Sequence, residues 1–287
     1  MKKIIMIFVF AVAFFIGLNY VVGEYKVQAA VPYQDVRKSF ISDLSKLNEE
    51  NEKIGDYHIW VSGNSQDGYK LYASKNDDGS SPIIVKTFKK NPPGDLVTNG
   101  KTIYYSVGDR ENGTVYKITI GKKAKKVFSV EKLKRVAGVY KNKIYYIRHE
   151  DENEEPWASA LYVYDIKKKT HSKLVDDFGF LSSYGRYILG NENHSDVSNT
   201  ELKLYDAKKR KCKMLQHKAI EGVVSSKGIR YSYIYEQNPT NKYRVYSCDL
   251  SGENNTLLYE DYLITSIILL GRDRIRFSYI RNNKTIQ

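Results

Sequence analysis

Short runs of alternating apolar and polar residues fill the chain from about residue 54 to its end. The stretch 99–118 contains two such runs, 103–105 and 114–116, joined by a polar loop. An alternation with a period of two over about four to eight residues predicts a half-buried β-strand. Asn112-Gly113 in the loop favours a tight turn. The stretch therefore predicts two strands joined by a turn.

The same pair of runs recurs along the chain at a nearly constant spacing. Runs similar to 99–105 start near residues 54, 141, 184, 227 and 272. The tyrosines of the second run, at positions 72, 116, 164, 205 and 246, are separated by 44, 48, 41 and 41 residues. A period of about 40 to 50 residues indicates a repeat architecture.

Each repeat contains four strand-like segments separated by turn residues. In the third repeat they are 135–139, 143–148, 160–165 and 172–175. Four short strands per repeat are typical of a β-propeller blade, which buries its faces against neighbouring blades. We therefore predict an all-β fold, a β-propeller of about six four-stranded blades. We expect the last blade to be incomplete and the 25 tyrosines mainly to pack between blades.

The first 29 residues have the three-part pattern of a secretory signal peptide. Lys2 and Lys3 precede a long apolar run, and small residues lead to a cleavage site near Ala29. We predict that the protein is secreted or associated with the cell surface. An uncleaved anchor is the alternative, because residues 4–22 are just long enough to span a bilayer.

Residues 30–52 separate the signal peptide from the repeats, which we assign to a β-propeller domain over residues 53–287. In this segment apolar residues follow a helical spacing, at Tyr33, Val36, Phe40, Ile41, Leu44 and Leu47. We expect a short N-terminal amphipathic helix. Its simplest role is to cover an exposed sheet edge where the ring closes.

Lysines concentrate in the turns between the third and fourth strands, and the chain carries a formal net charge of +13. The fold predicts that these turns lie side by side on one rim. We call the set the lysine arc, and it consists of Lys122, Lys123, Lys125, Lys126, Lys167, Lys168, Lys169, Lys208, Lys209 and Arg210.

Such an arc attracts polyanions and binds a polymer through several contacts at once. We predict that its partner is a polyanion of the cell wall or of the membrane. The alternative is that lysine-rich turns only keep sheet edges soluble. Nucleic acid is not expected, because the protein is predicted to be exported and no aromatic residues alternate with these lysines.

The turns between the second and third strands are acidic and belong to the opposite rim. The longest is 148–157. We predict that this acidic rim contacts a protein or glycan partner through Asp109, Glu111, His149, Trp157 and His194. The spacing of its carboxylates matches no metal-binding motif, so no metal is expected, and nothing in the sequence indicates a cofactor.

Catalytic motifs are absent from the sequence. It contains no nucleophile elbow, P-loop or dinucleotide-binding fingerprint, and its five histidines fall at unrelated positions of different repeats. We therefore predict a non-catalytic binding module. The alternative is a propeller hydrolase or lyase acting on an extracellular polysaccharide, and a third possibility is a structural remnant. A disulfide between Cys212 and Cys248 is left open.

The rhythm of the repeat, a turn followed by Ile-Tyr-Tyr and later by Leu-Tyr or Val-Tyr, resembles the TolB-like propellers. More narrowly, it resembles secreted bacterial propellers of unknown function related to YWTD modules. The resemblance covers about residues 54–287, although the YWTD tetrad itself is absent. It implies a binding scaffold and supplies no catalytic residues.

Overall fold

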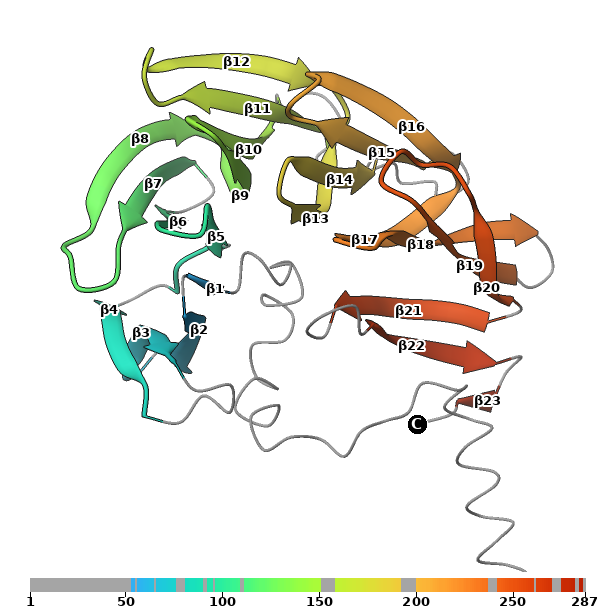
Figure 1. Ribbon diagram of the computed structural model, residues 1–287, viewed down its shortest axis with the longest axis horizontal. Coiled ribbons are helices and arrows are strands. Elements are labelled where there is room, and N and C mark those ends of the chain that lie inside the picture. Colours follow the sequence, from blue (N-terminus) through green and yellow to red (C-terminus); the bar gives the residue numbers. More distant parts are fainter. Residues whose placement is uncertain are drawn as a thin grey trace, which may run out of the picture.

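A computed structural model describes residues 53–285, except 55, 65, 76–80, 90–91, 95, 109–110, 151–157, 192–199, 237–241, 261, 270–274 and 282–283. Within these residues, the regular elements are β-strands arranged in six antiparallel sheets. The sheets follow one another around a common centre, and β9, β13 and β17 lie inside β12, β16 and β20 (Figure 1). The predicted all-β class is confirmed.

Each sequence repeat forms one sheet, because consecutive strands pair with one another. The first sheet contains β1 (Lys53–Ile54), β2 (Tyr57–Asn64), β3 (Gly68–Ser74) and β4 (Ile83–Phe88). The second contains β5 (Leu96–Thr98), β6 (Ile103–Gly108), β7 (Asn112–Ile118) and β8 (Lys125–Glu131). The third contains β9 (Leu133–Tyr140), β10 (Lys143–His149), β11 (Ser159–Asp165) and β12 (Thr170–Val175).

The later repeats follow the same plan. The fourth sheet contains β13 (Gly179–Tyr184), β14 (Tyr187–Asn191), β15 (Glu201–Asp206) and β16 (Lys211–His217). The fifth contains β17 (Ala219–Ser225), β18 (Gly228–Glu236), β19 (Lys242–Cys248) and β20 (Thr256–Glu260). The sixth, with three strands, contains β21 (Tyr262–Leu269), β22 (Ile275–Arg281) and β23 (Lys284–Thr285).

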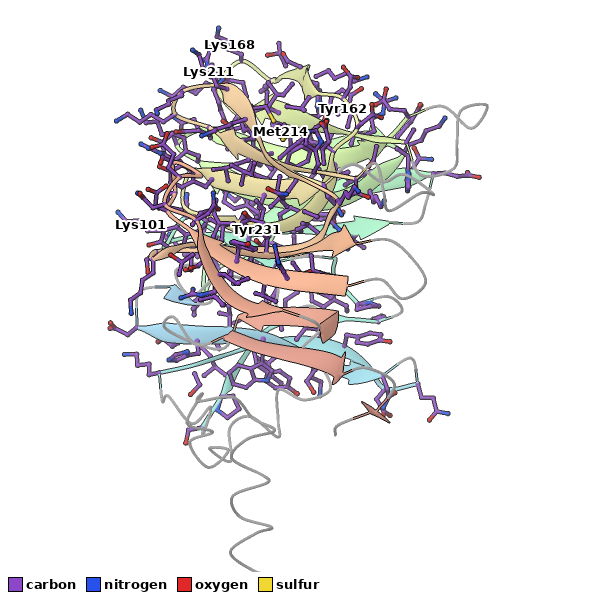
Figure 2. The ribbon with its side chains drawn as sticks, turned by 90° about the vertical axis from the view of Figure 1, so that its right-hand side faces the viewer. Lys101, Tyr162, Lys168, Lys211, Met214 and Tyr231 are labelled. Atoms are coloured by element: carbon purple, nitrogen blue, oxygen red, sulfur yellow. The ribbon has the colours of Figure 1, made fainter. Side chains whose placement is uncertain are left out.

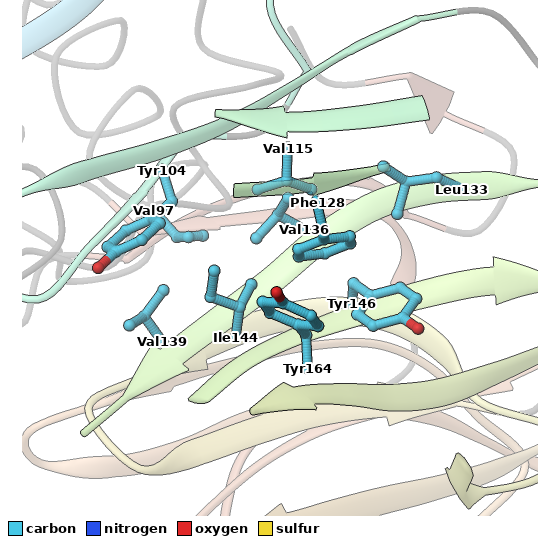
Figure 3. Close-up of a cluster of buried hydrophobic side chains, with 10 residues drawn as sticks. All are labelled: Val97, Tyr104, Val115, Phe128, Leu133, Val136, Val139, Ile144, Tyr146 and Tyr164. Carbon is cyan, nitrogen blue, oxygen red and sulfur yellow. The ribbon is translucent and has the colours of Figure 1, made fainter. Parts of the chain in front are cut away.

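Apolar side chains are buried mainly between neighbouring sheets. Figure 3 shows the cluster between the second and third sheets, formed by Val97, Tyr104, Val115, Phe128, Leu133, Val136, Val139, Ile144, Tyr146 and Tyr164. Similar clusters join the first sheet to the second, the third to the fourth and the fourth to the fifth. Because burial of apolar surface contributes most of the folding free energy, each sheet depends on its neighbours for stability.

An aromatic pair bridges the second and third strands of four sheets. The pairs are Trp60–Tyr72, Tyr105–Tyr116, Tyr146–Tyr162 and Tyr231–Tyr246, with ring centroids 5.6, 5.7, 5.5 and 6.0 Å apart. In each pair the two residues lie directly opposite each other across the strands. Such cross-strand pairs stabilise antiparallel sheets. The tyrosines of these pairs also lie in the clusters between sheets or pack against them. The expectation that tyrosines pack between blades is confirmed for these residues.

The fourth sheet breaks this pattern. Gly190 and Lys203 occupy the positions of the aromatic pair and lie opposite each other. The ring of Phe178 lies over Gly190, where a side chain would clash with it. In the fourth sheet, the Phe178 ring therefore fills the space that an aromatic side chain of the second strand fills in the four sheets with such a pair.

The tyrosine spacing used to define the repeat was wrong by two residues in two blades. A β-bulge between the third and fourth strands marks equivalent positions, and it falls at Tyr72, Tyr116, Tyr162, Lys203 and Tyr246. Tyr164 and Tyr205 therefore lie two residues beyond the equivalent position. A shift of two residues leaves a side chain on the same face of a strand, so the sequence pattern alone does not detect it.

The turn expected at Asn112-Gly113 is also wrong. Both residues lie in β7, and Gly113 is paired with Gly108 of β6. A Cβ atom on Gly113 would clash with the side chain of Leu133. Glycine is required there by the neighbouring blade rather than by a turn.

Several predictions concern residues outside the described part of the chain. The signal peptide (1–29) and the N-terminal helical segment (30–52) lie there, so both stay predictions. The number of blades in the closed ring and the completeness of the last blade also stay predictions. Among the described residues, no helix has the length and apolar character needed to cross a bilayer.

Candidate functional site

The hairpins that carry the lysine arc lie on one rim. In an antiparallel sheet of four consecutive strands, the first and third turns fall at the same end. The hairpins β7–β8, β11–β12 and β15–β16 are such third turns, on three consecutive sheets. Figure 2 shows Lys168 and Lys211 on the same side of the molecule as Lys101 from a first turn. We call this side the lysine rim.

All ten side chains of the lysine arc are exposed. Within the described part of the chain, no salt bridge joins any of them to a carboxylate. Their charge is therefore not neutralised by those carboxylates. An arc of such cations raises the local concentration of anions at the lysine rim.

Asp165 holds the arc hairpin of the third sheet in place. Its Oδ1 atom accepts hydrogen bonds from the backbone N–H groups of Lys167 and Lys168, each at 3.0 Å. The N–H group of Lys168, followed by that of Lys167 and the Lys143 cation 3.5 Å away, holds the pKa of Asp165 below its usual range. The carboxylate is thus occupied by the backbone and by Lys143, and the arc lysines point into solvent.

Asp206 does the same in the fourth sheet. Its Oδ1 atom accepts the backbone N–H groups of Lys208 and Lys209 at 2.9 and 3.2 Å, and it lies 3.3 Å from Arg186 Nε. Each of these hairpins closes on a residue with positive φ, Lys169 in one and Arg210 in the other, both at 56°. The sequence signal that would have revealed this cap is the Tyr-Asp pair that ends both third strands.

A second row of cations lies on the lysine rim, and sequence reasoning missed it. The first turns of the second, third and fifth sheets expose Lys101, Lys141 and Lys227. The signal was present, since a lysine stands next to each Gly or Asn that precedes the second strand. These residues extend the cationic surface from the outer hairpins toward the centre of the ring.

The second turns of the sheets, which form the predicted acidic rim, lie at the end opposite the lysine rim. Part of this acidic rim belongs to the described residues. The backbone N–H of Lys132 donates to Glu111 O at 2.7 Å, and that of His149 donates to Lys132 O at 2.9 Å. Glu111 and His149, predicted to act together, are therefore brought near each other through one shared neighbour. Asp109, Trp157 and His194 lie outside the described residues.

The first carboxylate of the long acidic loop is engaged by its surroundings. Glu150 Oε1 accepts the Tyr162 hydroxyl and Oε2 accepts Lys173 Nζ, both at 2.9 Å. Burial, together with the bond to Glu150, raises the pKa of Tyr162. The guanidinium of Arg148 lies 5.6 Å from the centre of the Tyr162 ring. With these cations present, the described part of this rim is mixed in charge rather than purely acidic.

A pocket of about 360 Å³ opens among the innermost strands β9, β13 and β17. The residues with polar or charged side chains that line it are Lys134, Arg135, Asn191 and Glu221. Lys134 is exposed at the mouth, where desolvation by the surrounding residues and the neighbouring Arg135 cation lower its pKa. Among the described lining residues, Glu221 supplies the one carboxylate. In the part of the chain that the structure describes, no group of three or more histidine, cysteine or acidic side chains could bind a metal.

The two cysteines lie in different sheets, Cys212 in β16 and Cys248 in β19, and both are free thiols. Burial raises the pKa of Cys248 to about 11. Cys212 is exposed, and partial desolvation of its sulfur also raises its pKa. Neither thiol is therefore activated as a nucleophile, because the thiolate is the reactive form.

No protein-family model matches the chain, and no curated protein is similar in sequence. Solved structures are similar in fold. TolB from Acinetobacter baumannii matches with a TM-score of 0.51 and 16% identity over 73% of this chain and 54% of TolB. An oligogalacturonate lyase in complex with manganese matches with a TM-score of 0.54 and 11% identity, over 78% of this chain and 68% of the lyase.

A third similar structure is the acylaminoacyl peptidase of Pyrococcus horikoshii. Its TM-score is 0.52 and its identity 12%, over 78% of this chain and 40% of the peptidase. The chain thus spans about half the length of the TolB that it matches, at 54%. At such low identities the likeness shows the fold and not the activity. With its repeated antiparallel sheets around one centre, the chain has a β-propeller fold similar to that of TolB.

Proposed function

We propose that this protein is a non-catalytic binding module, exported to the cell envelope, that docks onto an anionic surface through the lysine arc. One observation carries the proposal. Ten cationic side chains on three consecutive hairpins are exposed and form no salt bridge with a described carboxylate.

The strength of such docking comes from the number of contacts. A lysine or arginine near an anionic membrane surface contributes about 1 kcal/mol, and the attraction falls off within a Debye length of about 8 Å at physiological salt. Because Asp165 and Asp206 fix the backbone of two hairpins, little backbone conformational entropy is lost on binding. Binding is therefore expected to be multivalent and strongly sensitive to salt.

The opposite rim remains free when the lysine rim faces the surface. We assign it to a protein or glycan partner, contacted through Glu111 and His149 and, from the sequence prediction, Asp109, Trp157 and His194. The mixed charge near Glu150 favours a partner with both polar and charged groups. The fold also supports enzymes, but the residues described near the axis supply no observation in favour of hydrolase or lyase chemistry.

The test is binding of the mature protein to isolated cell envelopes at low and at high salt. A K122E/K168E double variant should bind more than about tenfold more weakly at low salt, because each reversal replaces an attraction of about 1 kcal/mol with a repulsion. The matched control is K134E/K218E, which makes the same change in charge on the opposite rim. Sedimentation of the envelopes with bound protein measures the affinity.

The outcomes separate the proposal from a general effect of net charge. Weaker binding of K122E/K168E, with near-normal binding of K134E/K218E, supports docking through the lysine arc. Equal losses in both variants would mean that only the net charge of +13 matters. Unchanged binding of both would overturn the proposal.

A further inference from the structure

A groove of about 600 Å³ lies on the lysine rim between the first and second sheets. One side is the start of β4, with Ile83, Ile84, Val85 and Lys86. The other side is the end of β7 and the first hairpin of the lysine arc, with Ile118, Gly121, Lys122, Lys123 and Ala124. Its size is within the range of about 300 to 1,000 Å³ that ligand pockets have.

The two isoleucines of the groove are unusually exposed. Ile83 retains 45% and Ile84 54% of its accessible surface, although large aliphatic side chains are mostly buried in proteins. Two other large apolar residues of the described chain are exposed to a similar degree, Met214 at 43% and Leu257 at 44%, on the outer strands of the fourth and fifth sheets. The isoleucines differ from these in that they are adjacent and line a groove.

The chemistry of the lining selects a type of ligand. Its described lining combines the aliphatic residues Ile83, Ile84, Val85 and Ile118 with Lys86, Lys122 and Lys123. No carboxylate is among the described lining residues. A soluble polyanion would satisfy the lysines but would leave the isoleucines in water. A molecule with an aliphatic chain and an anionic head matches both parts of the groove.

We propose that this groove binds an anionic phospholipid of a membrane, with acyl chain on Ile83 and Ile84 and head group at Lys86, Lys122 and Lys123. The inference rests on the proposed docking through the lysine arc and names its partner as a lipid surface rather than a wall polymer. One acyl-chain contact alone gives weak membrane binding, whereas an apolar contact combined with a polybasic patch gives a stable one. The groove and the arc together supply both.

The test uses vesicles of phosphatidylglycerol and phosphatidylcholine, with pure phosphatidylcholine vesicles for comparison. The full mature protein should sediment with the anionic vesicles and retain part of its binding at about 0.5 M salt, where lysine contacts are screened. The I83S/I84S variant should bind about tenfold more weakly and lose the salt-resistant part. L257S is the matched control, since it removes an equally exposed apolar side chain from the same rim of another sheet.

A second measurement does not depend on a loss of binding. A polarity-sensitive fluorophore attached to I84C, in a C212S background, should shift its emission to the blue when anionic vesicles are added. The same fluorophore at L257C should shift less. No difference between the two positions would overturn the inference, even if the protein binds vesicles.

The results also separate this inference from the proposed function. If K122E/K168E loses binding to anionic vesicles while I83S/I84S binds like the wild type, docking through the arc stands and the lipid groove is wrong. If the protein binds envelopes through the arc but no vesicles, the partner is a wall polymer or an acidic protein, and the groove inference also fails. Normal unfolding temperatures of both variants exclude misfolding as the cause of any loss.

Discussion

At the scale of single residues, Gly190 shows how one position can be required by a neighbour. Elsewhere the corresponding position carries Trp60, Tyr105, Tyr146 or Tyr231, each paired with an aromatic residue opposite. In the fourth sheet the ring of Phe178 takes up this volume and leaves no space for a Cβ atom. Phe178 is fully buried, so it cannot move aside without opening a cavity.

Gly190→Ala should therefore destabilise the protein by about 1 to 3 kcal/mol through overpacking. Gly138→Ala is the matched control, because a Cβ at that strand position would meet its nearest atoms at an ordinary 3.6 Å. We expect the stability of the control to be unchanged or slightly increased, since alanine restricts the unfolded chain. Urea unfolding of both variants measures the difference, and equal stability of the two would contradict this account of Phe178.

At the scale of elements, the recurring unit is a hairpin capped by an aspartate. Asp165, Asp206 and Asp249 each end a third strand or follow it directly, and each accepts backbone N–H groups of the next turn. The side chain thereby replaces a turn hydrogen bond that the backbone alone would not make. The cap is the same in three sheets although the residues it supports are lysines in two of them and mainly acidic or polar residues in the third.

The fifth hairpin gives a test by pH. Hydrogen bonds from the Ser251 side chain and from the Glu253 backbone, followed by those from Asn254, hold the pKa of Asp249 at about 2. Because this value is below that of about 3.9 in an unfolded chain, the cap contributes stability above pH 4 and loses it as the pH falls through 2. The backbone amide shifts of Ser251 and Glu253, followed by NMR, should titrate near pH 2.

Asp249→Asn provides the control for this titration. An amide oxygen still accepts the backbone N–H groups but does not ionise, so the shifts of Ser251 and Glu253 should lose their transition near pH 2. A midpoint near pH 4 in the wild type would show that the hydrogen bonds to Asp249 do not hold in solution.

At the scale of the whole molecule, stability comes from contacts between blades. Ile144 is fully buried in the cluster between the second and third sheets, whereas Ile84 on an outer strand is more than half exposed. Each blade contributes one face to the cluster on either side of it. Unfolding of one blade would therefore expose the faces of two neighbours.

Ile144→Ala should cost about 2 to 5 kcal/mol, the usual range for truncating a buried isoleucine. Ile84→Ala should lower the free energy of unfolding by less than about 0.5 kcal/mol, because the side chain is largely exposed in the folded protein. Thermal unfolding followed by circular dichroism measures both. Similar midpoints for the two variants would show that the interface between blades is not the main source of stability.

Much of the fold was predictable because the same local sequence pattern occurs in each repeat. The strands of the third repeat were placed within about two residues, and the lysine hairpins were assigned to third turns. The register between strands was not predictable, as Tyr164 and Tyr205 show. A shift of two residues leaves the alternation of apolar and polar positions unchanged. Most lysines of the arc were predictable as turn residues, but Lys125 and Lys126 lie in β8. The groove at Ile83 and Ile84 was not predictable.

The sequence by itself determined the all-β class, the repeat and the order of strands, because these follow from local alternation and turn chemistry that each segment carries alone. Only the tertiary structure decided what paired strands and neighbouring blades impose. It placed Phe178 over Gly190, engaged Glu150 with Tyr162 and Lys173, and left two isoleucines exposed beside a lysine hairpin. The first two contacts join residues that meet only when the strands of one sheet pair, and the groove forms only where two blades lie side by side.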